Sequence, residues 1–348
     1  MNIVTTDSQS ASSNCIANPN QSPSEGWKGS MRAAFRRLDD LAAYLQLPES
    51  VGDGVQAASD QFPLFVPREF AAKMTPGDVL DPLLLQVLPH PLETVSTEGF
   101  TTNPVGDDEA TLTPGLLQKY HGRALMVTTG ACAVHCRYCF RRHFPYSEGP
   151  KGIGAWEPAL EAIAADQSLH EILLSGGDPL TLTDGILRQL AERIASASHV
   201  RRLRLHTRLP VMIPSRIDDQ LLAWLTGSRL KPFLVIHTNH PRELAEDVAG
   251  ALARLTEAGV PLLNQTVMLR GVNDQAETLI ELSEKLLDLG VMPYYLHQLD
   301  RVQGAAHFEV PKAEGFQIVE TMRSRLPGYA VPRFVEEIAG DTSKRVIA

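Results

Sequence analysis

Three cysteines within eight residues are the most chemically distinctive feature of the sequence. Cys132, Cys136 and Cys139 have the spacing C-x3-C-x2-C, and they directly follow an apolar run at 123–129 that is typical of a strand. Three thiolates on one loop can hold a four-iron cluster and leave one iron without a protein ligand. An open iron position indicates chemistry on a bound molecule, whereas electron-transfer clusters usually have four cysteine ligands.

Two other interpretations of these cysteines remain open at this point. A structural zinc site normally has four ligands, and His135 or His143 would have to complete the set here. Inert buried thiols would be scattered along the chain rather than clustered. The fourth cysteine, Cys15, is isolated in a polar segment, and we interpret it as a bystander.

A glycine pair follows the second predicted strand, in the run Ser175, Gly176, Gly177 and Asp178. Paired glycines let the backbone approach a ligand closely, although a plain turn between a strand and a helix would also use them. Together with the cysteine spacing, this run resembles the radical S-adenosylmethionine (SAM) enzymes. The resemblance implies a [4Fe-4S] cluster held by the three cysteines, whose free iron chelates SAM, and a glycine-rich motif that holds the SAM amino group.

Strand-like and helix-like segments alternate after residue 123, which predicts a parallel sheet with right-handed crossovers. Six such units are fewer than the eight of a closed barrel. The expected fold class is therefore α/β, an open (β/α)6 partial barrel, as the radical SAM resemblance also implies, with ligands at the C-terminal strand ends. The predicted strands are 124–128, 171–175, 202–206, 232–237, 262–269 and 292–297, and the predicted helices lie near 156–166, 184–197, 217–227, 242–258 and 274–289.

Four regions are expected along the chain. They are a disordered polar tail (1–25), a helical N-terminal extension (26–110), the partial barrel (111–310) and a C-terminal segment (311–348). In the extension, apolar residues at near-helical spacing predict one amphipathic helix over 27–47.

Composition and charge indicate the class of protein and the cellular compartment in which it is expected. The 348 residues are 43% hydrophobic and 21% charged, which is an ordinary globular balance. The first residues lack the basic and apolar parts of a secretory signal, and no apolar run has transmembrane length. Because the net charge is −9, binding to nucleic-acid phosphates is not expected. We therefore expect a cytoplasmic protein that binds neither nucleic acid nor membrane.

Three further segments narrow the resemblance to the lysine 2,3-aminomutases. They are 239–243, 264–274 and 293–300, and the matching motifs keep the order of that family from about residue 120 to 344. Gln265, in the second segment, is expected to contact a cofactor. A plainer role for the end of that segment is to cap the following helix.

This family also uses pyridoxal phosphate (PLP), whose aldehyde forms a Schiff base with a lysine. The resemblance assigns that lysine to Lys344, which follows one glycine where the larger aminomutases have several. Position alone would make a near-terminal lysine a surface residue. Lys119, Tyr120 and Arg123 match the basic-aromatic segment of the family, so Arg123 is expected to pair with the PLP phosphate and Tyr120 to stack. An ordinary polar start of a strand is the alternative.

For a lysine substrate, the resemblance implies that Arg141 binds the carboxylate and that Asp300 and Glu337 surround the ε-ammonium. Glu337 stands where the larger aminomutases have Asp. The implied reaction is an isomerisation of L-lysine to β-lysine. In it, an electron from the reduced cluster cleaves SAM to methionine and a 5′-deoxyadenosyl radical, a β-hydrogen is abstracted, and nitrogen moves from Cα to Cβ.

The compact run 338–344 resembles the bacterial branch that makes (R)-β-lysine for elongation factor P. That branch implies L-lysine as the small-molecule substrate, an electron donor protein, and a functional link to elongation factor P and its lysyl ligase; an oligomer is possible. One alternative is an aminomutase for another amino acid such as glutamate, which should have a cation where Asp300 or Glu337 stands. The other is a non-catalytic iron-sulfur sensor, which needs neither Lys344 nor the glycine pair.

Overall fold

A single ten-stranded sheet organises the computed structural model, which describes residues 26–348. The strands are β1 (Thr111–Thr113), β2 (Leu116–Tyr120), β3 (Arg123–Thr129), β4 (Glu171–Gly176), β5 (Arg202–Thr207), β6 (Lys231–His237), β7 (Leu262–Val267), β8 (Val291–His297), β9 (Arg333–Glu336) and β10 (Arg345–Val346). Their order in the sheet is their order in the chain. Neighbours from β3 to β9 are parallel, whereas β1, β2 and β10 pair in antiparallel fashion.

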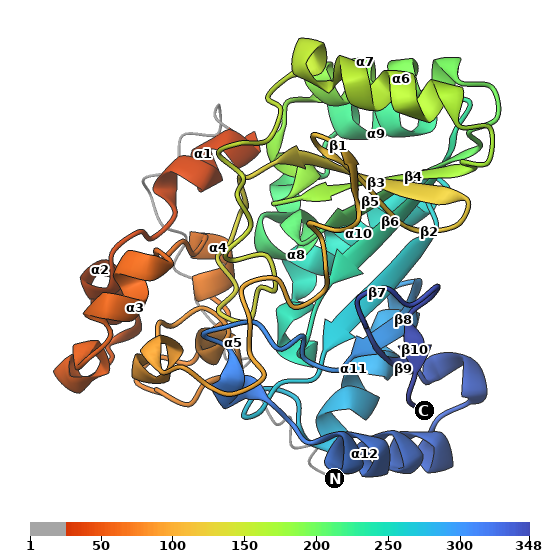
Figure 1. The fold of residues 1–348 in the computed structure, drawn as a ribbon. Helices are drawn as coiled ribbons and strands as arrows, with labels where there is room; N and C mark the ends of the chain where they lie inside the picture. Colours follow the sequence, from red (N-terminus) through yellow and green to blue (C-terminus); the bar gives the residue numbers. More distant parts are fainter. Residues whose placement is uncertain (1–25) are drawn as a thin grey trace, which may run out of the picture.

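Helices connect the parallel strands, which confirms the expected (β/α)6 partial barrel (Figure 1). The helices after β3 are α6 (Glu157–Ala165), α7 (Asp184–Ser196), α8 (Leu209–Met212), α9 (Asp219–Thr226), α10 (Glu246–Glu257), α11 (Ala276–Asp288) and α12 (Lys312–Arg325). Short 3-10 turns supplement them at η3 (Ile153–Trp156), η4 (Pro179–Thr181), η5 (Pro214–Arg216), η6 (Pro241–Glu243), η7 (Ala306–Phe308) and η8 (Gly328–Ala330).

The core lies between the sheet and these helices. In β6, for example, Leu234, Val235 and Ile236 are successive residues without exposed surface, so the strand is covered on both faces. On the helix side, α11 buries Leu279, Leu282 and Leu286 at helical spacing. These apolar runs are the features from which the alternating strands and helices were predicted.

Four strands were not predicted, because they are short or polar. Strand β2 has only two buried residues, at its start, and its remaining positions, which include Lys119 and Tyr120, are half-buried. Lys119 and Tyr120 therefore lie within β2, ahead of the first predicted strand at 124–128. Strand β9 adds a seventh parallel strand after the six predicted units.

The N-terminal extension differs from the prediction of one helix over 27–47. It contains α1 (Gly26–Ala33), α2 (Leu38–Leu45), α3 (Gln56–Gln61), α4 (Arg68–Ala71) and α5 (Pro82–Leu85), with the turns η1 (Glu49–Gly52) and η2 (Pro91–Thr94). Between α1 and α2, Phe35 N donates to Val66 O at 2.8 Å, and Val66 N donates to Phe35 O at 3.0 Å. Since this bridge uses the backbone groups of Phe35, the helix cannot continue through it. The tail predicted for residues 1–25 lies outside the described residues, and the other domain boundaries stay predictions.

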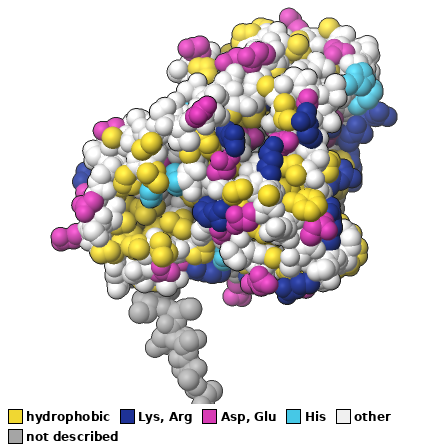
Figure 2. All heavy atoms as spheres, turned by 60° about the horizontal axis from the view of Figure 1, so that its bottom comes forward, with side chains coloured by type: hydrophobic (Ala, Val, Ile, Leu, Met, Phe, Trp, Pro, Cys, Tyr) yellow, Lys and Arg dark blue, Asp and Glu magenta, His cyan; other side chains and the backbone are white. Residues whose placement is uncertain are grey.

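The surface carries both signs of charge. Figure 2 shows Lys and Arg side chains interspersed with Asp and Glu, and apolar side chains gathered on the side where α2 and α3 lie. Within residues 26–348, no helix combines the length and the apolar character that a membrane crossing requires.

One buried carboxylate joins the N-terminal extension to the cysteine loop. Glu93, in η2, accepts hydrogen bonds from Arg137 Nε at 2.8 Å and from Arg142 Nη2 at 2.7 Å, and it is almost without exposed surface. Arg137 Nη1 also donates to Phe62 O at 2.6 Å. Two guanidiniums on the loop thus depend on one carboxylate from the extension.

We expect Glu93→Ala to lower the free energy of unfolding by about 3–5 kcal/mol, because it leaves two buried guanidiniums without their counter-charge. Urea denaturation followed by circular dichroism measures this change. The matched control is Glu320→Ala, which removes an exposed ion pair with Arg323 and should change the free energy by less than about 1 kcal/mol. Equal effects of the two substitutions would contradict the dependence of these guanidiniums on Glu93.

Candidate active site

The cysteine loop follows the C-terminal end of β3. Cys132, Cys136 and Cys139 are free thiols with partial exposure. Burial, followed by the charges of neighbouring cysteines, raises the pKa of Cys132 well above its ordinary value and that of Cys139 to about 11. Three thiolates this close repel one another, whereas bound iron would compensate their charge and keep them deprotonated. The donor set therefore fits an iron-sulfur cluster.

The alternative of a single zinc ion fits the geometry less well. In the part of the chain that the structure describes, no three Cys, His, Asp or Glu side chains are arranged to hold one metal ion. The two histidines that would complete a zinc site bond to backbone elsewhere. His135 Nδ1 lies 2.7 Å from Pro63 O, and His143 Nε2 lies 3.1 Å from Gln303 O.

The glycine pair at the end of β4 lies against the backbone that leads into the cysteine loop. A Cβ on Gly176 would lie 2.6 Å from Thr129 O, and a Cβ on Gly177 would lie 2.3 Å from Ala131 O. Gly176 also has φ +120°, which side chains rarely tolerate. The pair therefore has a role within the chain, because only glycine permits this approach next to Cys132.

Asp178 fixes the same region to the next strand. Its carboxylate accepts hydrogen bonds from Thr207 Oγ1 at 2.8 Å and from the backbone N of Arg208 at 2.7 Å. Burial raises the pKa of Asp178, and these hydrogen bonds oppose that shift. Asp178 thus orders the loop after β5, and direct contact with SAM stays a prediction for it and for the neighbouring Ser175.

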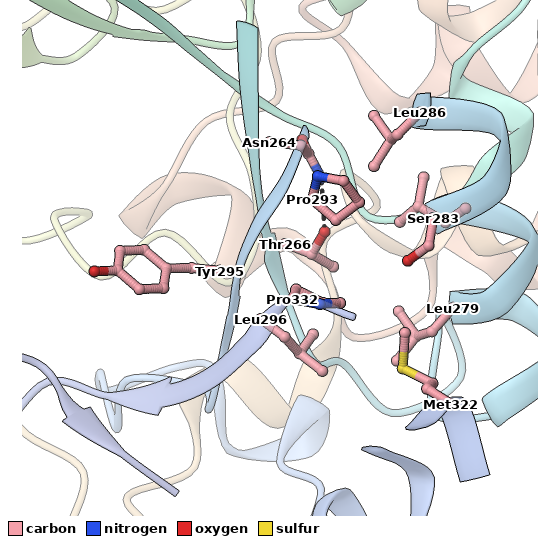
Figure 3. A pocket seen from close by; sticks show the side chains of 11 residues that line it. Asn264, Thr266, Leu279, Ser283, Leu286, Pro293, Tyr295, Leu296, Met322 and Pro332 are labelled. Atoms are coloured by element: carbon pink, nitrogen blue, oxygen red, sulfur yellow. Dashed lines mark hydrogen bonds between the residues drawn. The ribbon is translucent and has the colours of Figure 1, made fainter. Parts of the chain in front are cut away.

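Gln265 lies on β7 between two residues that face the helices. Figure 3 shows Asn264 and Thr266 beside a narrow cavity in front of Ser283 and other α11 side chains. Because side chains alternate along a strand, Gln265 is on the opposite face, which is the interior of the barrel. That placement is compatible with the predicted cofactor contact.

Five charged side chains form a continuous series of ion pairs, which we call the charge chain. In order they are Lys344, Glu337, Lys119, Asp107 and Arg141. Glu337 pairs with Lys344, and its other oxygen lies 3.1 Å from Lys119 Nζ. Asp107 lies 2.8 Å from Lys119 Nζ and 2.7 Å from Arg141 Nε. Positive and negative groups therefore alternate from the predicted PLP lysine to the predicted carboxylate-binding arginine.

The pKa values of two acids near Lys344 are shifted in opposite directions, that of Glu337 downward and that of Asp300 upward. Although burial raises the pKa of Glu337, the charges of Lys344 and Lys119 lower it to about 2. Burial raises the pKa of Asp300 to about 7, and the charge of Lys344 opposes that rise only partly. Burial thus outweighs the charge of Lys344 at Asp300, which suits a carboxylate that receives a further cation from a ligand.

Tyr120 and Arg123, the predicted basic-aromatic pair, lie beside Glu337, near the Lys344 end of the charge chain. The guanidinium of Arg123 lies 4.8 Å from the ring centre of Tyr120. Burial raises the pKa of Tyr120, and the charge of Glu337 and a hydrogen bond to it raise it further. Tyr120 is therefore a neutral group beside Glu337, while phosphate binding by Arg123 stays a prediction.

Three site residues were missed from the sequence. Asp107 completes the charge chain, but no motif marks it. His206 and His297, at the ends of β5 and β8, have buried Nε2 atoms without a hydrogen-bond partner among the described residues. Burial, followed by nearby cations including Lys344, lowers the pKa of both, that of His297 to about 3. Their strand-end positions in a parallel barrel were the available signal.

Comparison with known proteins finds relatives over most of the chain. The family described as the Radical SAM superfamily matches residues 126–283. The chain is 44% identical over 324 residues to the L-lysine 2,3-aminomutase of Haemophilus influenzae, covering 93% of this chain and 96% of that protein. It is 48% identical over 289 residues to the protein of the same name from Escherichia coli, covering 83% and 84%, and 39% identical over 322 residues to that of Buchnera aphidicola, covering 92% and 94%.

We expect Gly177→Ala to lower the iron content per chain severalfold after anaerobic reconstitution, because the added Cβ must displace the backbone at Ala131. Iron and sulfide assays measure this loss. Gly250→Ala, in α10, is the matched control, since a Cβ there meets nothing within 4 Å and alanine favours helix. Full iron loading of Gly177→Ala would show that the close approach is unimportant.

Proposed function

The chain belongs to the lysine 2,3-aminomutase family of radical SAM proteins, and from this we propose that it converts L-lysine into β-lysine. The observation that carries the proposal is the charge chain. It has a cation for a carboxylate at one end, and at the other end Lys344 lies close to two acids that suit an ammonium. A zwitterionic substrate with a terminal amine matches this polarity.

Each end of the substrate has a proposed partner. Arg141 is almost fully buried and contacts both Asp107 and Ser175 Oγ, so its guanidinium is oriented before a carboxylate arrives. Asp300 and Glu337 would hold the ε-ammonium. A glutamate substrate would bring a second carboxylate to these two acids, which the charges disfavour.

The remaining residues are proposed to hold the cofactors. Cys132, Cys136 and Cys139 would ligate the [4Fe-4S] cluster, Gly176 and Gly177 would face SAM, and Lys344 would bind PLP covalently. When bound, these groups supply a radical and an electron-accepting anchor for the migrating nitrogen. Arg123 would pair with the PLP phosphate and Tyr120 would stack on the cofactor, and the buried His206 and His297 would donate or accept single hydrogen bonds as neutral imidazoles.

The route to Arg141 starts at a cavity between 102–108 and 140–145. Asp107 and Arg141 both line it, together with Phe140 and Phe144. Because Asp107 and Arg141 belong to the charge chain, a substrate entering here would meet its carboxylate-binding end first.

The finer assignments depend on the resemblance of the segment 338–344. They are (R)-β-lysine as the product, its use in modifying elongation factor P through the lysyl ligase of that factor, an electron donor protein as the source of electrons, and a cytoplasmic location. A reducing compartment suits three clustered thiols that must stay unpaired until iron binds.

The decisive experiment is anaerobic turnover of L-lysine with SAM, PLP and a chemical reductant, with the product resolved by chiral chromatography. We expect (R)-β-lysine. Formation of (S)-β-lysine would reject the elongation factor P branch, and absence of any β-amino acid would reject the aminomutase proposal.

Borohydride reduction of the PLP-loaded protein should fix the cofactor on Lys344, because that amine lies at the end of the charge chain. Peptide mass spectrometry locates the label. Lys312→Arg, which removes an exposed lysine paired with Glu336, should leave the labelling unchanged. A label on another lysine would reject the assignment of Lys344.

The pKa of Asp300 predicts an acidic limb in the pH profile. Below about pH 7 its carboxyl group is protonated in the free protein, so kcat/KM for lysine should fall about tenfold per pH unit as the ammonium loses its counter-charge. Steady-state kinetics between pH 5.5 and 8.5, roughly the range where His and shifted acids titrate, would measure this limb.

Two variants test the origin of that limb. Asp300→Asn should have a lower kcat/KM, by about tenfold or more, without the limb. Glu337→Gln should retain the limb but shift it to lower pH, because the charge of Glu337 contributes to the raised pKa of Asp300. An unchanged limb in Asp300→Asn would assign it to another group.

A further inference from the structure

A buried guanidinium contacts one of the predicted iron ligands. Arg208 directly follows β5, and its Nη1 donates to Cys136 Sγ and to Tyr138 Oη, both at 2.8 Å. The Arg208 side chain is 7% exposed, so water competes little for these hydrogen bonds. None of the roles assigned above explains why a cation lies against this sulfur.

The other end of the guanidinium is held by the N-terminal extension and by the turn after β6. Arg208 Nη2 donates to Gln86 Oε1 at 2.6 Å and lies 3.1 Å from Glu243 Oε2. Glu243 is fully buried, and its second oxygen accepts hydrogen bonds from Gln86 Nε2 and from Asn239 N, both at 3.0 Å. The guanidinium therefore has one fixed orientation and a compensating charge.

The backbone of Arg208 is fixed as well. Its N donates to Asp178 Oδ2 at 2.7 Å, so the glycine-rich motif after β4 determines where the side chain begins. The position of this cation is thus set by Asp178, and its direction by Gln86 and Glu243.

We propose that Arg208 is a positioning residue that raises the reduction potential of the cluster through its hydrogen bond to Cys136 Sγ. This inference rests on the proposed function, because it needs the cluster. Reduction adds one electron from the electron donor protein and no bond forms or breaks. The reduced cluster carries one more negative charge, so a fixed cation at a ligating sulfur stabilises it more than the oxidised cluster.

The role has a consequence for how the site works. Without the cation, three thiolates and buried Glu243 would make addition of an electron harder. With it, an electron donor protein of ordinary reducing strength can load the cluster. Glu243 limits the effect, because its negative charge partly compensates the guanidinium.

The test is the midpoint potential of the reconstituted protein without SAM, measured by redox titration with electron paramagnetic resonance of the reduced cluster. In the double variant Arg208→Met/Glu243→Gln, both buried charges disappear together, which avoids an unpaired carboxylate. We expect its reduction equilibrium to be about tenfold less favourable, a decrease of about 59 mV for one electron. Arg208→Lys keeps the charge but cannot contact all four acceptors, so its potential should lie between those of the double variant and the unmodified protein.

The matched control is Arg216→Lys. Arg216 is also fully buried and paired, with Asp184 at 2.8 Å, but the hydrogen bonds described for its side chain go to Asp184 and to carbonyls of η4 and its surroundings. Its potential should equal that of the unmodified protein. A shift of the same size in this control would assign the effect to general loosening and overturn the proposal.

Other outcomes are equally distinct. Iron-loaded Arg208 variants with an unchanged potential would overturn the proposal, and a loss of SAM affinity alone would make Arg208 a SAM ligand instead. If the double variant fails to hold iron, the reduction potential of Arg208→Lys is the test: a lowered potential supports the proposal, and an unchanged potential overturns it. If the unmodified protein forms no cluster at all, the proposed function fails first, and this inference with it.

Discussion

The candidate site depends on charges that are buried only because they are paired in series. An isolated ion costs several kcal/mol to bury, and an ion pair offsets that cost only with good geometry. Along Lys344, Glu337, Lys119, Asp107 and Arg141 each interior group has a partner on both sides. The series begins with a cation and ends with a cation. A carboxylate bound by Arg141 therefore leaves Asp107 paired with Lys119.

The same principle connects the N-terminal extension to the barrel. Glu93 accepts hydrogen bonds from two arginines of the cysteine loop, and Gln86 accepts one from Arg208, which contacts Cys136 of that loop. The loop that carries the thiols is short and irregular, so its conformation is determined by neighbours more than by its own backbone. In physical terms the extension is part of the site, although its helices lie beside the sheet (Figure 1).

The sequence predicted what depends on local pattern. Strands such as β6 are buried on both faces, so they appear in the sequence as continuous apolar runs. Helices such as α11 have apolar residues at helical spacing. The alternating strands and helices of the barrel were therefore predictable. Strands β1, β2, β9 and β10 are too short or too polar to stand out.

Pairings across the chain were not predictable in the same way. Lys119 and Glu337 are 218 positions apart, and Asp107 and Arg141 are 34 apart, so no spacing rule joins them. The cysteines and glycines were recognisable because each set lies within a few consecutive residues of the sequence. Asp107, Arg208, His206 and His297 act through the environment that the fold creates, and that environment appears only in three dimensions.

The segment that carries Lys344 is weakly held on the sheet, which affects how readily it can open. Its segment returns to the sheet through β10, which pairs with β9 over two residue pairs and keeps both its residues exposed. Few buried contacts hold such a strand, so opening of this segment costs far less free energy than unfolding of the barrel. The lysine is therefore held on a hinge-like edge whose amides should exchange with solvent early. If Lys344 is the proposed PLP anchor, such an edge would let it move when the covalent bond to the cofactor forms and is released.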